Sequence, residues 1–378
     1  RATIAWSYDL LDDAEKRLLT RIAVFRGGCT LEAAEAVADA DLDVLESLVD
    51  KSLIRRTLDR FWMLETIREF ALEQLHEPEL RMRHARHYLE LAEEAYSNLK
   101  ATPKPWLDRL DAEHDNLRSA LDHLERADLE LAAELAGALH RFWYMRGHLR
   151  EGSERTERVL ARHARPTSAR ARLLDGAAVL ALNRADYPLG RRHAEEALAL
   201  HRDLDEPWGE AYSQMLLGNA ASGEDDFATA SRLTERSAGQ FRELGDDYYA
   251  RLATGNFAYH VQELGDLERA RAVLEENVAS SRAAHDERNL AGGLGQLGQV
   301  TIMQGRARDA YAPLTEALRI WRAIGDLTMA ARDLRRLARV LVEQGHAEAA
   351  ARVLAASEAI REETGQQEGW IPTVNQRI

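Results

Sequence analysis

The sequence predicts an all-α chain in which stacked helical hairpins follow a small winged-helix domain with a β-hairpin wing. The hairpins are indicated by two columns of small residues, which recur every 40 positions and contain only Ala or Gly. They are Ala178, Gly218, Ala258, Gly298 and Ala338, and then Gly190, Ala230, Ala270, Ala310 and Ala350. A period of this length fits two helices with two turns, and small residues are needed where two helices cross closely.

Glycines also follow the 40-residue period, at the positions expected for turns. Glycine readily adopts the positive φ that ends a helix. These glycines are Gly265, Gly305 and Gly345 inside the units, and Gly245, Gly325 and Gly365 between them.

Composition restricts the class of protein. The 378 residues carry a net charge of −14, 45% are hydrophobic and only 8 are proline, which is typical of a helix-rich chain. No apolar run approaches the roughly 20 residues needed to cross a bilayer, and no signal peptide opens the chain, so we expect a cytoplasmic protein and no membrane partner. Cys29 is the single cysteine, which excludes an internal disulfide and a cysteine-rich zinc site. Because the chain begins at Arg1, we expect it to be part of a longer protein.

Residues 1–76 lie outside the repeat and predict a winged-helix domain, because three helical patterns precede two short β-prone runs. The expected helices are Asp12–Phe25, Thr30–Ala38, Asp41–Lys51 and Glu65–Leu75, and the expected strands are Ser52–Arg56 and Phe61–Leu64, joined by Thr57–Arg60.

Two further regions complete the predicted domain organisation. Residues 77–127 predict a helical bridge of two amphipathic helices, split by Ala101–Pro105. Residues 128–378 predict the repeat domain, with an irregular hairpin at 128–164, five 40-residue units at about 168–362 and a C-terminal tail.

The regular units resemble tetratricopeptide repeats, in which Gly or Ala on the first helix and Ala on the second mark the crossing. The usual period is 34 residues, so each helix here would be longer by about three residues, or roughly 4.5 Å. This resemblance implies a right-handed superhelix whose first helices line a concave face.

A second resemblance rests on whole phrases in the first 165 residues. They are Trp6–Leu11, Leu18–Phe25, Gly27-Gly28, Leu48–Ile54, Met63–Ala71 and Glu113–Arg118. These phrases resemble the segment that follows the nucleotide-binding domain in bacterial STAND ATPases, including transcriptional regulators of the AfsR/SARP, LuxR and MalT types. The resemblance implies that ATP or ADP and Mg²⁺ bind to an upstream domain, and that the winged helix packs on that domain as a latch.

Two phosphate-binding patterns bear on whether this segment is an enzyme. The motif GxxxxGK[ST] is absent, so we expect no ATP hydrolysis by the segment and no cofactor in it. Gly293–Gly298 does match GxGxxG, but it falls within an expected helix rather than after a strand, so we interpret its glycines as packing residues.

The winged helix raises the possibility of DNA binding. Residues 1–75 contain ten basic and fifteen acidic residues, and the helix before the wing, Asp41–Lys51, is acidic. Since such a surface faces phosphates badly, we expect contact with protein rather than nucleic acid.

Histidines provide two weaker patterns. His84 and His87 are spaced as metal ligands on a helix, but Arg81, Arg83 and Arg86 surround them, so we expect a solvated basic face and no metal. His114 and Asp115 could form a general base; the alternative is that Glu113–Arg118 makes a structural hydrogen-bond cluster.

The strongest candidate site is the concave groove. Offsets of −6, −3, +1 and +4 from the first small column place residues on the concave side of each first helix. The candidate ligand or partner residues are Arg141, Tyr144, Arg172, Asp175, Tyr212, Met215, Asn219, Tyr259, Gln262, Gln299, Arg332, Arg335 and Arg339. The arginines suit carboxylate or phosphate recognition; alternatively they pair with Glu343, Asp333 or the next helix.

Together these patterns predict the sensor and regulatory part of a STAND-type transcriptional regulator. It would bind an effector protein, peptide or small molecule in the groove and control the upstream ATPase through the winged helix. Two alternatives remain open, a protein-interaction scaffold without a small-molecule effector and the regulatory region of a cyclase or kinase.

Overall fold

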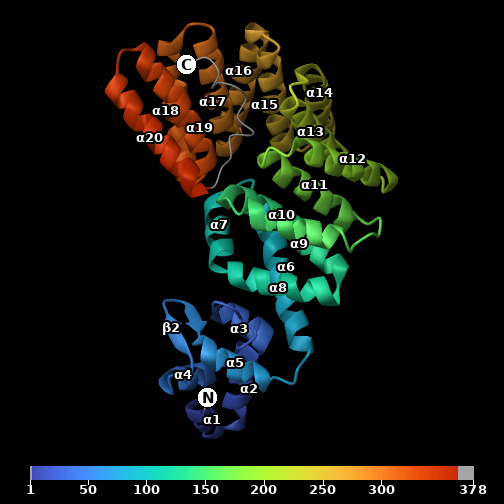
Figure 1. Ribbon diagram of the computed structural model, residues 1–378, viewed down its shortest axis with the longest axis vertical. Coiled ribbons are helices and arrows are strands. Elements are labelled where there is room, and N and C mark those ends of the chain that lie inside the picture. The colour runs from blue at the N-terminus through green and yellow to red at the C-terminus, as the bar shows by residue number, and fades with distance from the viewer. Residues whose placement is uncertain (1, 365–378) are drawn as a thin grey trace. The chain divides into compact units, whose positions relative to one another are not determined.

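A computed structural model describes residues 2–364 and confirms a nearly all-helical chain with a winged helix and stacked helical pairs (Figure 1). The chain divides into two compact units. The winged-helix unit comprises the residues up to Ala95 together with Asp108–Leu135, and the repeat unit comprises Tyr96–Leu107 and the residues from Ala136 onward. Among the described residues, no helix is both long and apolar enough to span a membrane.

The winged helix follows the predicted order, with one helix and one strand that the sequence patterns did not predict. Its elements are α1 (Ala2–Asp9), α2 (Asp13–Ile22), β1 (Cys29–Thr30), α3 (Leu31–Ala38), α4 (Leu42–Asp50), β2 (Arg55–Thr57), β3 (Arg60–Trp62) and α5 (Glu65–Glu73). A capping box between Asp12 and Glu15 begins α2. The core between the helices and the sheet contains Leu19, Phe61 and other fully buried apolar side chains.

The wing is shorter and more tightly turned than predicted. Strand β3 pairs antiparallel with both β2 and β1, and the connection is only Leu58-Asp59, with Leu58 at φ 55°. The third strand, β1, was missed because two residues, Cys29 and Thr30, are too few to show an alternating pattern.

The predicted bridge contains three helices rather than two. They are α6 (Glu79–Asn98), α7 (Pro103–Ala112) and α8 (His114–Ala127). The additional break falls at Glu113, whose carboxylate is held by Arg60 and Tyr88 of other elements. The irregular hairpin follows as α9 (Leu129–Arg146) and α10 (Leu149–Leu160).

Five regular pairs build the rest of the repeat unit. They are α11 (Ser168–Asn183) with α12 (Tyr187–Asp203), α13 (Pro207–Gly223) with α14 (Phe227–Glu243), α15 (Asp247–Glu263) with α16 (Leu267–Ala283), α17 (Glu287–Met303) with α18 (Ala307–Ile324), and α19 (Leu327–Glu343) with α20 (Ala347–Thr364). All ten residues of the two small columns are buried, as predicted. A Cβ on Gly218 would lie 2.7 Å from Thr234, and one on Gly298 would lie 2.7 Å from Leu314, so the column faces the partner helix.

Helix caps and turns repeat with the same period. Aspartates at 20- or 40-residue intervals accept a hydrogen bond from the backbone N–H three residues on, and so begin the helices that follow. They are Asp186, Asp226, Asp246, Asp266, Asp286 and Asp326. The predicted turn glycines from Gly245 to Gly345 have positive φ, while Gly365 lies outside the described residues.

The GxGxxG match is a packing feature, as expected. It lies inside α17, where a Cβ on Gly293 would meet Val278 at 2.8 Å and one on Gly298 would meet Leu314. The glycines therefore allow neighbouring helices to approach α17, and no strand precedes them as a dinucleotide site would require.

Candidate ligand pocket in the repeat unit

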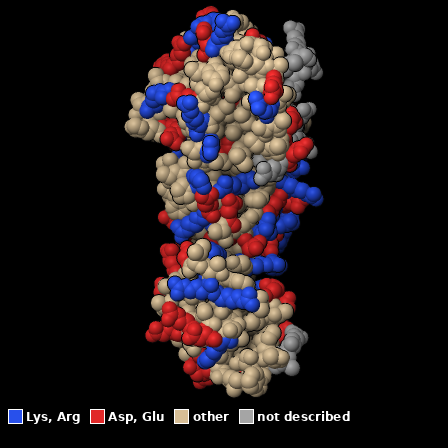
Figure 2. All heavy atoms as spheres, turned by 90° about the vertical axis from the view of Figure 1, so that its left-hand side faces the viewer, with Lys and Arg blue, Asp and Glu red and all other residues tan. Residues whose placement is uncertain are grey.

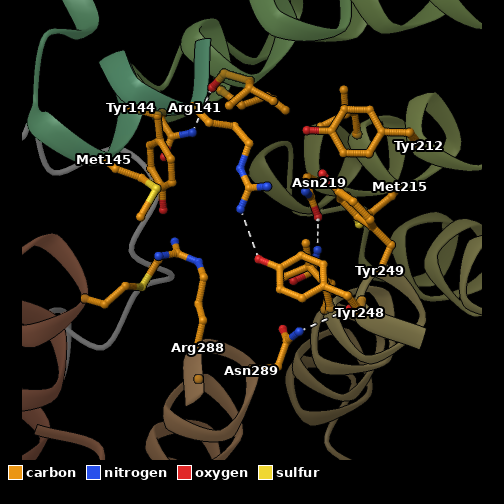
Figure 3. Close-up of a pocket in the computed structure, with 18 of the residues that line it drawn as sticks. Arg141, Tyr144, Met145, Tyr212, Met215, Asn219, Tyr248, Tyr249, Arg288 and Asn289 are labelled. Atoms are coloured by element: carbon orange, nitrogen blue, oxygen red, sulfur yellow. Dashed lines mark hydrogen bonds between the residues drawn. The ribbon is translucent and has the colours of Figure 1, made fainter. Parts of the chain in front are cut away.

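The repeat unit contains a pocket of about 180 Å³ that is lined by the first helices of successive pairs (Figure 3). Helices α9, α11, α13, α15, α17 and α19 all contribute, since a superhelix turns its first helices toward the same face. The lining residues are His140, Arg141, Tyr144, Met145, Val179, Leu182, Asn183, Tyr212, Met215, Leu216, Asn219, Tyr248, Tyr249, Leu252, Asn256, Arg288, Asn289, Gly292, Gln296, Trp321, Met329 and Arg332.

Six of the thirteen residues predicted from the sequence line this pocket. They are Arg141, Tyr144, Tyr212, Met215, Asn219 and Arg332. These six come from three first helices, α9, α13 and α19, so the structure brings together residues that lie almost 200 positions apart in the chain.

The other seven predicted residues lie elsewhere in the repeat unit. Arg172 packs on the ring of Tyr96, with its guanidinium 4.3 Å from the ring centroid. Asp175 is buried in the packing between helices, where it accepts hydrogen bonds from Ser213 and His201. Four others also lie outside the pocket lining. Gln262 and Gln299 are buried, Tyr259 is largely buried, and Arg335 is half-buried.

The predicted arginine cluster is largely paired within its own helix. Arg339 bonds to Glu343 at 3.3 Å, and Arg336 bonds to Asp333 at 2.8 Å. Of this cluster only Arg332 lines the pocket, and its Nε lies 3.9 Å from the carboxylate of Asp333. The alternative in which these arginines pair with Glu343 and Asp333 therefore accounts for Arg336 and Arg339 and, through the longer contact with Asp333, for Arg332.

Several lining residues were not predicted, because the predicted stripe of concave residues began one helical turn too late along each first helix. Tyr248 and Arg288 lie at offset −10 from the small column, one turn before the predicted −6 position. Extending the stripe by four residues toward the start of each first helix would have found both. Asn256 and Gln296, at offset −2, belong to the adjacent row of the same helices.

Aromatic side chains form one wall of the pocket. The rings of Tyr212 and Tyr249 meet edge to face at 5.4 Å, and Trp208 stacks on Tyr212 at 5.2 Å. Burial raises the pKa of Tyr212 and of Tyr249 well above the usual value, so both phenols are neutral at physiological pH. Lys100 lies 4.5 Å from the Tyr249 ring and bonds to Asp246 at 3.0 Å, which supports this wall from behind.

Amide side chains supply polar groups next to this wall. Asn256 donates to the side-chain oxygen of Asn219 at 3.1 Å, and Asn289 donates to the backbone oxygen of Tyr248 at 3.1 Å. The Oε1 atom of Gln296 is buried and has no hydrogen-bond partner among the described residues. Amide groups of this kind can donate to and accept from the backbone of an extended peptide.

The charged side chains of the pocket are cationic. Arg141, Arg288 and Arg332 line it, and none of its lining residues in the described chain is Asp or Glu. Arg288 pairs with Asp326 at 2.6 Å, whereas Arg141 is 9% exposed and donates only to the hydroxyl of Tyr248 at 3.0 Å. Isolating a charge from water costs several kcal/mol, while a cation–π contact returns about 0.5 to 2 kcal/mol. We therefore expect Arg141 to lower the stability of the free protein.

A second buried polar group lies in the winged-helix unit and is fully bonded. Asn116 accepts from the backbone N–H of Arg26 at 2.7 Å and donates both to Gly28 O and to Glu113, each at 2.8 Å. Glu113 also accepts from Tyr88 at 2.9 Å and from Arg60. We call Asn116, Glu113, Tyr88, Arg60 and His84 the Asn116 cluster. It confirms that Glu113–Arg118 makes a structural hydrogen-bond cluster, which fastens the winged helix to α6 and α8.

The predicted solvated face around His84 is wrong for His84 itself. Its ring is 2% exposed, and Nε2 lies 3.3 Å from Asn116 Oδ1. Burial lowers the pKa of His84 to about 4, so the ring is neutral. Arg81 and Arg86 are exposed as predicted.

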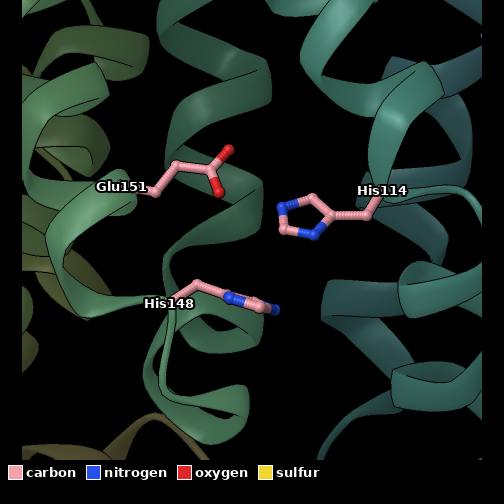
Figure 4. Close-up of side chains that lie close together, drawn as sticks. All are labelled: His114, His148 and Glu151. Carbon is pink, nitrogen blue, oxygen red and sulfur yellow. The ribbon is translucent and has the colours of Figure 1, made fainter. Parts of the chain in front are cut away.

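A second group that contains histidines offers possible metal ligands. Figure 4 draws His114 together with His148 and Glu151. Because His114 belongs to the winged-helix unit and the other two residues belong to the repeat unit, we assign no metal site to them.

The exposed face of α4 is acidic. Asp43, Glu46 and Asp50 are exposed, while Leu45 and Leu48 face the core. On the molecular face drawn in Figure 2, positive and negative side chains both occur. The acidic residues exposed on α4 are unfavourable for contact with phosphates.

These features define a tetratricopeptide-like helical-repeat protein with a winged-helix domain, and comparison with known proteins agrees. Residues 11–76 match the model of a family described as a winged helix-turn-helix domain. A Mycobacterium tuberculosis protein named as an HTH-type transcriptional regulator is 36% identical over a region covering 55% of this chain and 26% of that protein. The chain thus spans about a quarter of the length of this curated relative.

Solved structures show the same fold at low sequence identity. A Rap protein complexed with competence and sporulation factor aligns with a TM-score of 0.60 at 15% identity, over 96% of this chain and 99% of that one. NprR in complex with its cognate peptide NprX aligns with a TM-score of 0.52 at 15% identity, over 68% of this chain and 77% of that one.

Proposed function

We propose that this chain is the sensor and regulatory part of a STAND-type ATPase transcriptional regulator, and that the pocket of the repeat unit binds an effector peptide. In this proposal ATP or ADP and Mg²⁺ bind an upstream domain, and the segment itself binds without catalysing a reaction. The similarity to an HTH-type transcriptional regulator supports the regulatory class.

The observation that carries the proposal is the pocket, where unbonded buried polar groups lie beside an aromatic wall. Gln296 Oε1 and Arg141 Nη1 are both buried without hydrogen-bond partners among the described residues. Polar groups of this kind that lie in a pocket are available to bind a ligand. Two proteins of similar fold, NprR and a plasmid-encoded Rap regulator, are described in complex with peptides, which supports a peptide as the ligand class.

We propose that the winged helix transmits the effect of ligand binding in the pocket to the upstream ATPase domain. The Asn116 cluster joins the winged helix to α6 and α8, so these elements would move as one body. Since the exposed face of α4 is acidic, we propose that the winged helix packs on the upstream domain instead of reading DNA.

Affinity selection tests peptide binding directly. The chain would be incubated with a synthetic hexapeptide library, separated from unbound peptide by rapid gel filtration, and its retained peptides identified by mass spectrometry. We expect a defined subset to be retained, and Asn219→Ala to lose it, because the Asn219–Asn256 pair faces the pocket. Glu348→Gln, at a surface side chain with 88% exposure, is the control and should retain the same subset. Equal retention by wild type and Asn219→Ala would contradict binding in this pocket.

The regulatory step needs the longer protein with its nucleotide-binding region. We expect a retained peptide to change the release rate of fluorescent ADP several-fold in wild type and not in Asn219→Ala. An unchanged rate in wild type would favour an interaction scaffold over a sensor.

A further inference from the structure

Arg141 is the buried charge in the pocket for which the described residues supply no anion. Its guanidinium extends from α9 into the pocket and is drawn in Figure 3 with its bond to Tyr248. Nη2 donates to that hydroxyl at 3.0 Å, while Nη1 is buried and has no hydrogen-bond partner in the described part of the chain. The rings of Tyr96 and Tyr248 flank the guanidinium at 5.9 and 5.7 Å.

Neighbouring carboxylates are already engaged elsewhere. Asp326 pairs with Arg288 and also caps α19 through the N–H of Met329. Asp333, which lies nearest to Arg332, accepts from Trp321 at 2.9 Å and from Arg336 at 2.8 Å. The pocket therefore keeps an excess of positive charge that no side chain lining it neutralises.

Resting on the peptide-binding function proposed above, we propose that Arg141 binds a carboxylate of the effector. The open Nη1–H of Arg141 donates to one carboxylate oxygen, and the guanidinium of Arg332 lines the same space. Tyr212, Met215 and Leu216 provide apolar surface for the part of the ligand next to the acid. Peptides carry this chemistry either at the C-terminus or on an Asp or Glu side chain.

A carboxylate fits these donors better than a phosphate group does. A phosphate monoester carries close to two charges and three strongly accepting oxygens, which call for several free donors. Here Arg288 is already paired, so the donors are mainly the two N–H groups on Nη1 of Arg141, with Arg332 lying partly shielded beside Asp333. A single planar acid with two oxygens can accept from these donors, whereas a phosphate monoester brings a further charge and a third oxygen.

Three hexapeptide libraries of the same uncharged residues distinguish the two sources of the carboxylate. One has free C-termini, one is amidated, and one is amidated with a single Asp in the middle. Each is presented to the chain at low ionic strength, and retention is read by mass spectrometry. We expect at least ten-fold greater retention of one or both acidic libraries than of the neutral one, since a hydrogen bond to a charged group is worth about that factor.

Variants assign the preference to Arg141. Arg141→Gln should abolish the preference for acidic peptides and Arg141→Lys should keep part of it, whereas Arg150→Gln, at a side chain with 89% exposure, should leave it intact. Circular dichroism checks that each variant is folded. Retention of acidic peptides by Arg141→Gln at the wild-type level would overturn the assignment.

The outcomes separate this inference from peptide binding itself. Equal retention of neutral and acidic peptides, lost in Asn219→Ala, would leave peptide binding standing and refute the carboxylate site. If no peptide is retained, the carboxylate site can still be tested with glutarate. An increase in thermal stability with glutarate that is absent in Arg141→Gln would support the carboxylate site without supporting peptide binding. No stabilisation by glutarate in that case, or stronger stabilisation by inorganic phosphate, would refute it.

Discussion

In the winged-helix unit the buried polar side chains satisfy one another, whereas in the repeat unit the pocket leaves polar groups unused. Asn116 makes four polar contacts, with His84 and Glu113 of its cluster and with the backbone of Arg26 and Gly28. Arg141 makes one hydrogen bond, to Tyr248. Both residues are buried to a similar degree.

This difference separates structural groups from binding groups. A saturated network adds stability and fixes one arrangement of its elements. An unsaturated site costs stability in the free protein and recovers it when a ligand arrives. Substitutions at the two places should therefore change stability in opposite directions.

The largest loss is expected for Asn116→Ala. It leaves the buried N–H of Arg26 without its partner and removes one hydrogen bond each from Glu113 and from the carbonyl of Gly28, which keep their bonds to Arg60, so the free energy of unfolding should fall by about 3 kcal/mol. Urea unfolding followed by circular dichroism measures the change. The neighbouring substitution Asp115→Ala removes a 56%-exposed side chain and should change stability by less than about 0.5 kcal/mol. A loss as small for Asn116→Ala would show that the cluster does not hold this unit together.

Gly209→Ala should cost about 2 kcal/mol in the repeat unit, because its Cβ would overlap the ring of His201. That ring cannot move aside easily, since Asp175 and Glu206 hold its two nitrogens at 2.9 and 2.7 Å. Gly239→Ala is the matched control: nothing lies within 4 Å of its Cβ, and it should gain about 0.5 kcal/mol from helix propensity. Equal effects in thermal unfolding would mean that the packing at Gly209 adapts.

Arg141→Met should raise stability by about 1 kcal/mol, the opposite sign to Asn116→Ala. The substitution keeps much of the apolar stem and removes a buried charge that lacks an anion. Thermal unfolding without ligand measures the gain. A loss greater than about 1 kcal/mol would instead make Arg141 a structural partner of Tyr248.

The stability of the repeat unit should also fall as the pH rises above about 6.5, the ordinary pKa of His. Burial opposes the charged ring of His201, but the hydrogen bonds and charges of Asp175 and Glu206 outweigh it and raise the pKa of His201. A raised folded-state pKa gives stability that is complete below the unfolded-state pKa and is lost as pH rises through the folded value.

Unfolding free energies between pH 6 and pH 9 test this dependence. His201→Gln should be less stable at pH 6 and flatter over the range, whereas His346→Gln, at an exposed position, should keep the wild-type profile. A wild-type profile without a decline would show that His201 stays neutral.

The repeat architecture could be predicted because it depends on residues that recur. The small columns mark the crossings, and one set of offsets assigned the concave face and found Tyr212, Asn219 and Arg332 of the pocket. The wing was less predictable, because a two-residue strand such as β1 forms only through pairing with β3, which has no local pattern.

The selection of binding residues from that face could not be made from the sequence. Arg141 and Arg339 are the same residue type on first helices, yet Arg339 pairs with Glu343 while Arg141 pairs with no carboxylate of residues 2–364. Which arginine remains uncompensated depends on contacts between helices, such as the pairing of Asp326 with Arg288, and periodicity does not reveal them.

The smallest predicted effect concerns the turns between helices. The same backbone position recurs every 40 residues, so the strain of a left-handed alanine can be compared there with glycine. Ala185 adopts φ 62°, while Gly265, Gly305 and Gly345 adopt positive φ at the equivalent turns. Ala185→Gly should raise stability by about 0.5 kcal/mol, because relief of the left-handed strain slightly exceeds the added freedom of the unfolded chain. Ala355→Gly, at an exposed position inside α20, should instead cost about 1 kcal/mol. Chemical denaturation of both variants gives the comparison, and a loss at both positions would show that the turn at Ala185 carries no strain. A gain at Ala185→Gly would identify a cost that differs in kind from the one expected at Arg141, since only the latter could be recovered by a ligand.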